Sequence, residues 1–403
     1  MSKDSIFIDE IAWLDCWRKR IKEKKGKKRC ARCLHDEDIP GISFDEKGIC
    51  NYCKIHNELC KKFPSGDDGW ETLQEIANKI KRENKKNKYD VIVGVSGGCD
   101  SSYMLHISKK LGLKPLAVHY DNTWNTKISE ENLNNILKKL NVDLWKYTVA
   151  DKEYDDLYYS FLKAGVPDLE APSDIGLAAT LYMAADKFNV KYIFEGHSFR
   201  TEGISPLGWL YMDAKYISNV QKKFGTKKLK TFPNLWLSSW LKWMIIKKIK
   251  KIRPLWHIEH NKEETKKMLS EIYNWKWYGG HHLENKITAF YHTYFLPRRF
   301  GFDHRYNNLS ALVRSGQISK KNGLTQLYEP PKSDPEIVEL FKKRLGLSNE
   351  KFVELMTLPK KSYRDYETYK PTFERWRPFF YLMAKVDLIP WSFYIKYTSK
   401  DEI

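Results

Sequence analysis

Residues 96–102 have the sequence SGGCDSS and combine the residue types that bind phosphate. They follow the apolar run 91–95, typical of a strand buried on both faces, and precede a segment, 100–110, that we predict to be helical. Unpaired N–H groups at a helix N-terminus attract anions, and glycine lets the backbone approach them closely. We predict a cofactor-binding loop made of Ser96, Gly97, Gly98, Cys99, Asp100, Ser101 and Ser102, with Asp100 helping to hold Mg²⁺.

The ending of this loop distinguishes it from two other nucleotide-binding motifs. A Walker loop would end in Gly-Lys-Ser/Thr, and a dinucleotide fold would show Gly-x-Gly-x-x-Gly. The segment instead resembles the SGGxDS signature of the PP-loop ATP pyrophosphatases. That resemblance implies cleavage of ATP between its α and β phosphates, adenylation of a substrate oxygen, and displacement of AMP by a nucleophile. Asp100 and Ser101 are the catalytic candidates in the loop.

Three further positions are candidates because of their place in the expected sheet. Ligands of open parallel sheets lie at the carboxyl ends of the strands. His119 ends the strand predicted at 115–120 and is placed to meet adenine or ribose. Gly196 follows the strand predicted at 190–194 and is expected to lie against the nucleotide. Asp174 is either a second metal or acid–base carboxylate or the N-cap of a helix.

Two Cys-x-x-Cys pairs, separated by sixteen residues, have the spacing of a four-cysteine zinc site. The predicted ligands are Cys30, Cys33, Cys50 and Cys53, and four thiolates would make the zinc structural. An iron–sulfur cluster and free thiols are the alternatives. All seven cysteines lie at or before Cys99, which favours a reducing compartment over a disulfide framework.

The elements that must position these groups alternate between strand and helix from residue 89 onward. Strands are predicted at 91–95, 115–120, 142–149 and 190–194, with helices at 100–110, 154–163 and 175–188 and a further element capped by Ser129. This predicts an α/β fold with a doubly wound parallel sheet of the PP-loop, adenine nucleotide alpha hydrolase-like type. We expect a zinc unit at 1–63, an ATP-binding domain at 64–205, a sugar-substrate or lid region at 206–330 and a helical C-terminal element at 331–403.

The composition sets the surroundings in which the chain works. Hydrophobic residues make up 42% of the 403 positions, enough for a real core, and the formal charge is +19. Such a charge favours nucleic acid, anionic lipid or phosphate-bearing small molecules. We expect a cytoplasmic protein without a signal peptide or a spanning helix. The basic, aromatic segment 236–252 predicts an amphipathic helix that serves as a lid or docking face, or alternatively contacts a membrane surface.

With both motifs present, the chain resembles the N-acetyl sugar amidotransferases of bacterial surface-polysaccharide synthesis, the WbpG and PseA type. The resemblance runs through the cysteine quartet, the SGGCDSS loop, and the segments 172–174, 195–197, 277–282, 296–301, 309–312 and 314–317. It implies a lipopolysaccharide or O-antigen enzyme that adenylates the N-acetyl group of a UDP-linked diacetamido sugar. Ammonia then replaces the oxygen to give an acetamidino group. A separate glutaminase with a cyclase-like barrel subunit would supply the ammonia, because this chain offers no glutaminase cysteine.

The sugar site implied by the resemblance draws on the later segments. Arginine forks suit a diphosphate or a carboxylate, and the candidates are Arg298, Arg299, Arg305 and Arg314. His281 and His282 are expected to contact the sugar or to remove a proton from ammonia, with a surface role as the alternative.

The rival hypotheses are a tRNA-modifying PP-loop enzyme and a non-catalytic nucleotide sensor. The tRNA-modifying enzyme would thiolate tRNA or attach lysine to it. Thiolation usually needs cysteines beyond Cys99, so we expect no nucleic-acid partner.

Overall fold

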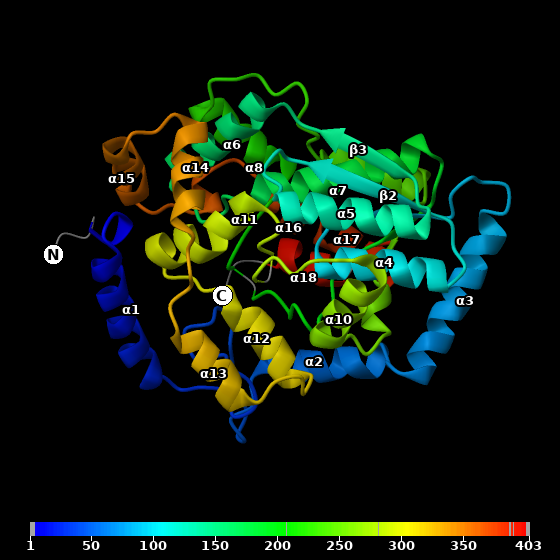
Figure 1. Ribbon diagram of the computed structural model, residues 1–403, viewed down its shortest axis with the longest axis horizontal. Helices are drawn as coiled ribbons and strands as arrows, with labels where there is room; N and C mark the ends of the chain where they lie inside the picture. Colours follow the sequence, from blue (N-terminus) through cyan, green and yellow to red (C-terminus); the bar gives the residue numbers. More distant parts are fainter. Residues whose placement is uncertain (1–4, 207, 281, 387, 390, 400–403) are drawn as a thin grey trace.

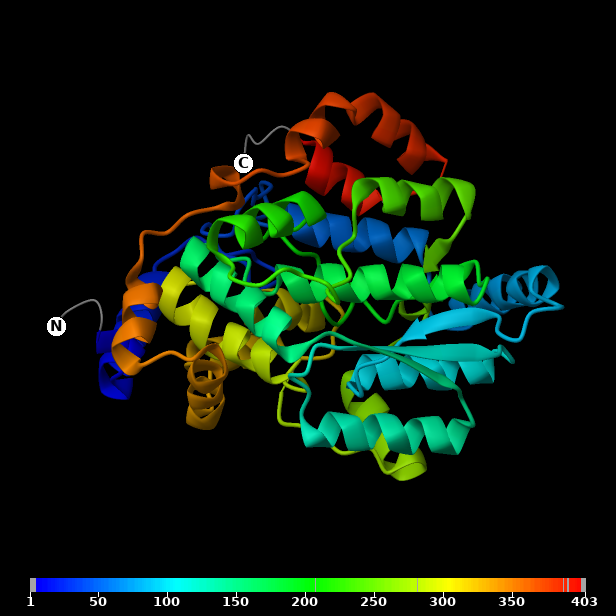
Figure 2. The same ribbon diagram turned by 90° about the horizontal axis from the view of Figure 1, so that it is seen from above.

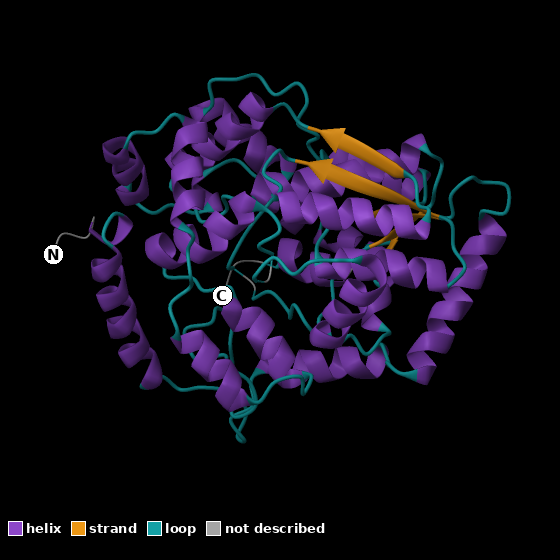
Figure 3. Cartoon of the chain, in the orientation of Figure 1, coloured by secondary structure: helices purple, strands orange, loops and turns teal. Residues whose placement is uncertain are grey.

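The centre of the molecule is a five-stranded sheet in which every strand pairs in parallel with its neighbours (Figure 3). The computed structural model describes residues 5–206, 208–280, 282–386, 388–389 and 391–399. The strand order is β3-β2-β1-β4-β5. The strands are β1 Val91–Gly94, β2 Pro115–Asp121, β3 Leu144–Thr148, β4 Tyr192–Phe194 and β5 Lys250–Ile252. The chain runs outward through β2 and β3 and then crosses to the other side of β1, so the predicted doubly wound fold is confirmed.

Helices cover both faces of this sheet (Figures 1 and 2). One face is covered by α3 Asp67–Glu83, α4 Cys99–Lys110, α5 Lys127–Leu140 and α10 Lys262–Tyr273. The other face is covered by α7 Ala171–Lys187, and α16 Lys370–Arg375, α17 Arg377–Lys385 and α18 Trp391–Thr398 pack beyond it. Because β1 has helices on both sides, Val91, Ile92 and Val93 are fully buried, as their unbroken apolar run predicts.

A second, aromatic core lies beside the sheet and holds the helical part of the chain. Phe161, Phe290, Phe341 and Phe352 are fully or almost fully buried there, and the rings of Phe290 and Phe341 stack with centroids 4.0 Å apart. The helices of this core are α6 Asp151–Ala164, α8 Ala214–Phe224, α11 Lys286–Phe290, a π-helix Tyr291–Phe300, α14 Pro335–Leu345 and α15 Asn349–Thr357. All described elements after residue 331 are helices, which confirms the predicted helical C-terminal region.

The N-terminal cysteine unit packs against the later part of the chain. It includes α1 Glu10–Lys25 and α2 Asn51–Lys62, and its core is shared with α12 Arg305–Arg314 and α13 Lys320–Tyr328. Leu34 and Leu309 lie in this joint core. The unit predicted at 1–63 is therefore docked onto residues far along the sequence.

The structure corrects two local predictions. Helix α5 begins at Lys127 and is capped by Thr126, whose Oγ1 accepts from the backbone N–H of Ser129 at 3.2 Å, so Ser129 is not the cap. The segment 236–252 is not one amphipathic helix. It forms α9 Leu237–Leu241, a π-helical turn Lys242–Ile246 and then strand β5, which pairs with β4.

Strand β5 also carries the sheet past residue 205, the predicted end of the ATP-binding domain. Glu195, which follows β4, forms ion pairs with Lys251 of β5 at 2.6 Å and with Arg253, just after β5, at 3.1 Å. These ion pairs place a counter-charge beside the basic residues at this edge of the sheet. Among the helices that the structure describes, none combines the length and apolarity needed to cross a bilayer.

Candidate active site

The phosphate loop lies at the carboxyl end of β1, where the direction of strand addition changes. Gly97 has φ +78°, and a Cβ there would lie 2.0 Å from the carbonyl oxygen of Ser129, so only glycine fits. A Cβ on Gly98 would lie 2.7 Å from Glu284 Oε1. Gly196, which follows β4, is within ordinary van der Waals distance of Asp100 and Ser101. The ends of β1 and β4 thus meet at the loop, as the sequence predicts.

Hydrogen bonds within the loop and around it fix its shape. Ser101 Oγ accepts from Ser96 N and donates to the carbonyl of Gly98, both at 3.2 Å. The buried indole of Trp275 donates to the carbonyl of Gly97 at 3.0 Å. These bonds hold the loop backbone in its turn, and Ser101 connects the two ends of that turn.

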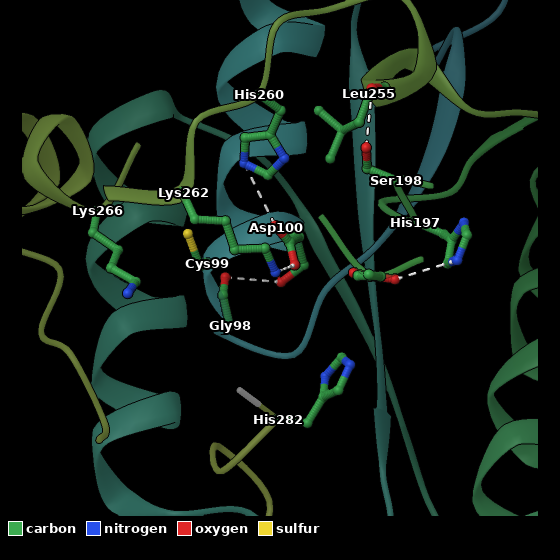
Figure 4. Close-up of polar contacts among 12 residues, drawn as sticks. Gly98, Cys99, Asp100, His197, Ser198, Leu255, His260, Lys262, Lys266 and His282 are labelled. Carbon is green, nitrogen blue, oxygen red and sulfur yellow. Dashed lines mark hydrogen bonds and ion pairs between the residues drawn. The ribbon is translucent and has the colours of Figure 1, made fainter. Parts of the chain in front are cut away.

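Asp100 is the electrostatic centre of the site (Figure 4). Lys262 Nζ lies 2.7 Å from its Oδ2, and His260 Nε2 lies 3.5 Å from its Oδ1. Burial opposes ionisation of Asp100, but Lys262 and then His260 outweigh it and hold the carboxyl pKa well below its usual range. Burial and the charge of Asp100 together raise the pKa of the neighbouring Glu202 to about 8. At neutral pH the site therefore holds one ionised and one mostly protonated carboxyl group.

His282 and Glu284 form a second charged pair beside the loop. His282 Nδ1 lies 3.9 Å from Glu284 Oε1, and the same carboxylate oxygen lies 3.3 Å from Ser96 Oγ. Desolvation lowers the pKa of His282, but Glu284 more than compensates and raises it to about 9. This raised pKa favours the protonated imidazole at neutral pH, and the roles expected of His282, contact with the sugar or removal of a proton from ammonia, stay predictions. His281, its predicted companion, lies outside the described residues.

The two other predicted positions lie on elements that border the loop. His119 is buried at the end of β2, where its Nδ1 lies 2.8 Å from the carbonyl oxygen of Val95 and its Nε2 lies 3.2 Å from Asn125 Nδ2. Asp174 lies in the first turn of α7 rather than at the N-cap, which is Glu170, so the N-cap alternative for Asp174 is wrong. Burial and the adjacent Asp174 raise the pKa of Glu170 to about 8.

The four arginines predicted to bind a sugar nucleotide are engaged elsewhere. Arg298 donates to the carbonyl of Ile6 at 2.7 Å and pairs with Glu10. Arg299 donates to the carbonyls of Leu355 and Leu358.

Arg305 pairs with Asp303 at 2.8 Å, and Arg314 donates to Cys33 Sγ at 3.3 Å. These contacts join helices and loops, so the prediction of an arginine-lined sugar site is wrong. The physical reason is that these arginines lie on two packed helices, the π-helix Tyr291–Phe300 and α12. Their guanidinium groups donate hydrogen bonds to carbonyls, acidic side chains and a cysteine sulfur of the protein itself.

Sequence reasoning missed the residues that surround Asp100. Lys262 begins α10, where Asn261 caps the helix by accepting from the N–H of Glu263 at 3.0 Å. Tyr278 OH accepts from the backbone N–H of Cys99 at 3.2 Å. Lys262 follows Asp100 by 162 positions and Tyr278 follows Cys99 by 179, too far for a local pattern to tie them to the loop. Tyr278 and Glu284 did carry a signal, because they lie within or just after the segment 277–282 on which the resemblance rests.

The cysteine quartet forms a compact buried cluster. The Sγ atoms of Cys30 and Cys53 are 3.7 Å apart, and those of Cys33 and Cys50 are 3.6 Å apart. All four sulfurs lie within 4.8 Å of one another. Backbone N–H groups of Arg32, Cys33 and Cys50 point at Cys30 Sγ at 3.3–3.4 Å. Sulfur atoms about 3.7 Å apart surround a tetrahedral ion with Zn–S bonds of about 2.3 Å, so these residues fit Zn²⁺ in a closed structural site.

Comparison with known proteins adds to this picture. Residues 284–382 match the family described as "LPS biosynthesis protein WbpG-like, C-terminal domain". An uncharacterized protein of Methanocaldococcus jannaschii is 27% identical over 78% of this chain and 98% of its own length. The tRNA-specific 2-thiouridylase MnmA of Photorhabdus laumondii is 29% identical over 30% of this chain and 37% of its own length. The structure of NMN synthetase from Francisella tularensis aligns over 70% of this chain and 95% of its own, with 13% identity and a TM-score of 0.31.

The doubly wound parallel sheet carries the SGGCDSS loop between β1 and α4, an arrangement that resembles the PP-loop ATP pyrophosphatases. Onto this sheet the chain adds a four-cysteine unit and a WbpG-like C-terminal domain, within which Glu284 reaches the loop.

Proposed function

We propose that this protein is an ATP-dependent carbon–nitrogen ligase of the N-acetyl sugar amidotransferase type. It would adenylate the N-acetyl group of a UDP-linked diacetamido sugar, release pyrophosphate, and replace the acetamido oxygen with ammonia in lipopolysaccharide or O-antigen synthesis. The observation that carries the proposal is the contact between the two parts of the chain. Glu284, the first residue of the WbpG-like match, lies against Ser96 of the phosphate loop.

The charges around the loop support ATP bound together with Mg²⁺. At neutral pH Lys262 and His282 are positive while Asp100 and Glu284 are negative, so these four side chains sum to zero. The electrostatic attraction on a polyphosphate would therefore come from the loop N–H groups and the α4 dipole rather than from these side chains. Asp100 and Glu284 offer the carboxylate oxygens that Mg²⁺ prefers, and Glu202 would join them on losing its proton. Magnesium bound there would neutralise part of the phosphate charge.

The proposed chemistry balances in two steps. The acetamido oxygen attacks the α-phosphorus of ATP, and pyrophosphate leaves. Ammonia then attacks the same acetamido carbon, the carbon–oxygen bond breaks, and AMP leaves with the oxygen. The new C–N centre must lose a proton. Glu170 and Glu202, each with a pKa of about 8, are matched to exchange that proton near neutral pH.

The nucleophile would come from outside the chain. The cysteines all lie at or before Cys99, and four of them form the metal cluster. We infer that a separate glutaminase with a cyclase-like barrel subunit delivers ammonia, as the resemblance to N-acetyl sugar amidotransferases implies.

A second candidate, tRNA modification, is favoured by the partial similarity to 2-thiouridylase MnmA and by the net charge of +19. Thiolation needs a cysteine to carry sulfur near the nucleotide, and Cys99 is buried with its pKa raised to about 12, chiefly by burial. Lysine attachment escapes this objection.

One assay separates these functions. The protein is incubated with Mg²⁺-ATP, ammonium and a panel of UDP-diacetamido sugars, or with tRNA plus lysine or a sulfur donor, and AMP, pyrophosphate and product mass are followed. The proposal expects AMP release that depends on a sugar, together with the mass change of exchanging oxygen for NH. AMP release that depends on tRNA and not on any sugar would contradict it.

A further inference from the structure

Two side chains of the phosphate loop and one from the segment before α10 form a group of metal-ligand type that the proposed function does not use as such (Figure 4). Cys99 Sγ, an Asp100 carboxylate oxygen and a His260 ring nitrogen all lie within 4.8 Å of one another. Cys99 and Asp100 begin α4, whereas His260 lies just before α10. Two helices that pack side by side thus bring one sulfur, one oxygen and one nitrogen donor to a single point.

His260 is the member that indicates a ligand. His260 is only 2% exposed, and in the described part of the chain neither of its ring nitrogens has a hydrogen-bond partner. Leaving a buried polar group unsatisfied costs about 1–3 kcal/mol, so such atoms are normally paired. The ring is held in place by Tyr103, which stacks on it at 5.1 Å and 17°. This packing aims Nε2 at Asp100 Oδ1, 3.5 Å away.

Asp100 completes the argument with its second oxygen. Oδ2 is taken by Lys262 at 2.7 Å, while Oδ1 faces His260 and has no hydrogen bond within the described residues. A cation placed between Oδ1, the imidazole and the Cys99 sulfur would give Asp100 Oδ1 and one His260 ring nitrogen the partner that each lacks among the described residues. Lys262 need not move, because it occupies the other oxygen.

We propose that Cys99, Asp100 and His260 bind a borderline-soft divalent cation such as Zn²⁺ at the head of the phosphate loop. This site is separate from the four-cysteine cluster, and it does not depend on which substrate the enzyme uses. A sulfur–nitrogen–oxygen donor set selects Zn²⁺ or Co²⁺ over Mg²⁺, which prefers oxygen ligands. Three protein ligands leave one tetrahedral position for water or a phosphate oxygen, as in catalytic zinc sites. Binding would release the Cys99 proton to solvent.

Cobalt provides the test, because a Co²⁺ ion bound to a thiolate absorbs in the near ultraviolet. Full-length protein carrying one zinc in the four-cysteine cluster is titrated with Co²⁺, and bound metals are counted by elemental analysis. We expect a second metal equivalent, a thiolate-to-cobalt band, and no displacement by excess Mg²⁺. Cys99→Ser should abolish the band, and His260→Gln, which keeps a polar side chain of similar length, should weaken Co²⁺ binding at least about tenfold.

A matched control excludes the other cysteine–histidine pair. Cys60 Sγ lies 3.5 Å from His56 Nε2, so Cys60→Ser removes a comparable pair far from the loop and should leave the cobalt band unchanged. Retained zinc in each variant shows that the chain is folded. Binding of a single metal equivalent would overturn the proposal. So would a band that survives Cys99→Ser, whether it comes from Cys60 or from exchange into the four-cysteine cluster.

Discussion

Replacing Arg314 with methionine should weaken zinc binding at the four-cysteine cluster. Arg314 is 5% exposed, and its Nη2 donates to Cys33 Sγ at 3.3 Å and lies 3.1 Å from His35 Nδ1. Four thiolates and one Zn²⁺ carry a net charge of −2, which a buried guanidinium would partly offset. For the guanidinium and the Cys33 thiolate taken as single unit charges at this distance, with an effective dielectric of about 20, the gross attraction is about 5 kcal/mol.

Most of that attraction is offset by the cost of burying the guanidinium. Outer-shell partners of metal ligands are worth about 10–100-fold in metal affinity, or about 1.4–2.8 kcal/mol. We expect Arg314→Met to lower zinc affinity by that factor, measured by competition with a chromogenic chelator. Arg18→Met is the matched control, because Arg18 is exposed and pairs only with the exposed Asp15 in α1. The control should change unfolding free energy by no more than about 0.5 kcal/mol.

The size of the effect without zinc distinguishes charge from packing. After chelation, the neighbouring cysteines hold the pKa values of the Cys50 and Cys53 thiols well above their usual range, so Arg314 faces less counter-charge and the methionine variant should lose less stability than it does with zinc bound. Urea unfolding with and without saturating zinc measures both cases. An equal loss of stability in the two conditions would show that Arg314 acts through packing, and the electrostatic explanation would then be wrong.

Three further predictions concern the loop and its surroundings. Asp100→Asn should abolish release of AMP and pyrophosphate while leaving the zinc of the four-cysteine cluster in place, and formation of ADP and phosphate by the wild type would contradict the PP-loop assignment. His282 has a pKa of about 9 when folded against about 6.5 unfolded, so its pairing with Glu284 stabilises the fold fully below pH 6.5 and is lost as pH rises through 9. Because 39% of the His282 side chain is exposed, we expect its pairing with Glu284 to stabilise the fold by only about 1 kcal/mol. The variant His282→Asn should lack this stabilisation, so its unfolding free energy should vary less with pH. Asparagine is chosen because His282 has φ +60°. Finally, high ammonium should support turnover by the chain alone, whereas glutamine should do so only with an added glutaminase and barrel subunit; glutamate release by the purified chain would refute this.

The sheet and the metal cluster could be predicted because their signals are local. The buried strand at 91–95 reads as an unbroken apolar run, and the Cys-x-x-Cys pairs lie within one short stretch. Each pattern reports a physical constraint, burial on two faces or four ligands around one ion, that acts on neighbouring residues. The loop between β1 and α4 is predictable for the same reason.

The surroundings of Asp100 could not be predicted, because they depend on how distant helices pack. Lys262 and His260 reach the loop only because α10 lies on the same face of the sheet as α4. The arginines show the converse error. Their grouping in one segment suggested a shared anionic ligand, but the helical period turns Arg298 and Arg299 toward different partners, and α12 turns Arg314 toward sulfur. Residue type and spacing alone do not say which way a side chain faces.

The segment Arg314–Gln317 contacts both the cysteine cluster and the residues that face Asp100. At its start Arg314 contacts Cys33, and at its end Gln317 Nε2 donates to the carbonyl of His260 at 2.9 Å. Gln317 Oε1 also accepts from the backbone N–H of Lys262 at 3.4 Å. Four residues of the WbpG-like domain therefore connect the zinc ligands to the two groups that face Asp100. Because packed interiors leave little free space, these contacts hold the backbone of His260 and Lys262 in place relative to the cysteine cluster.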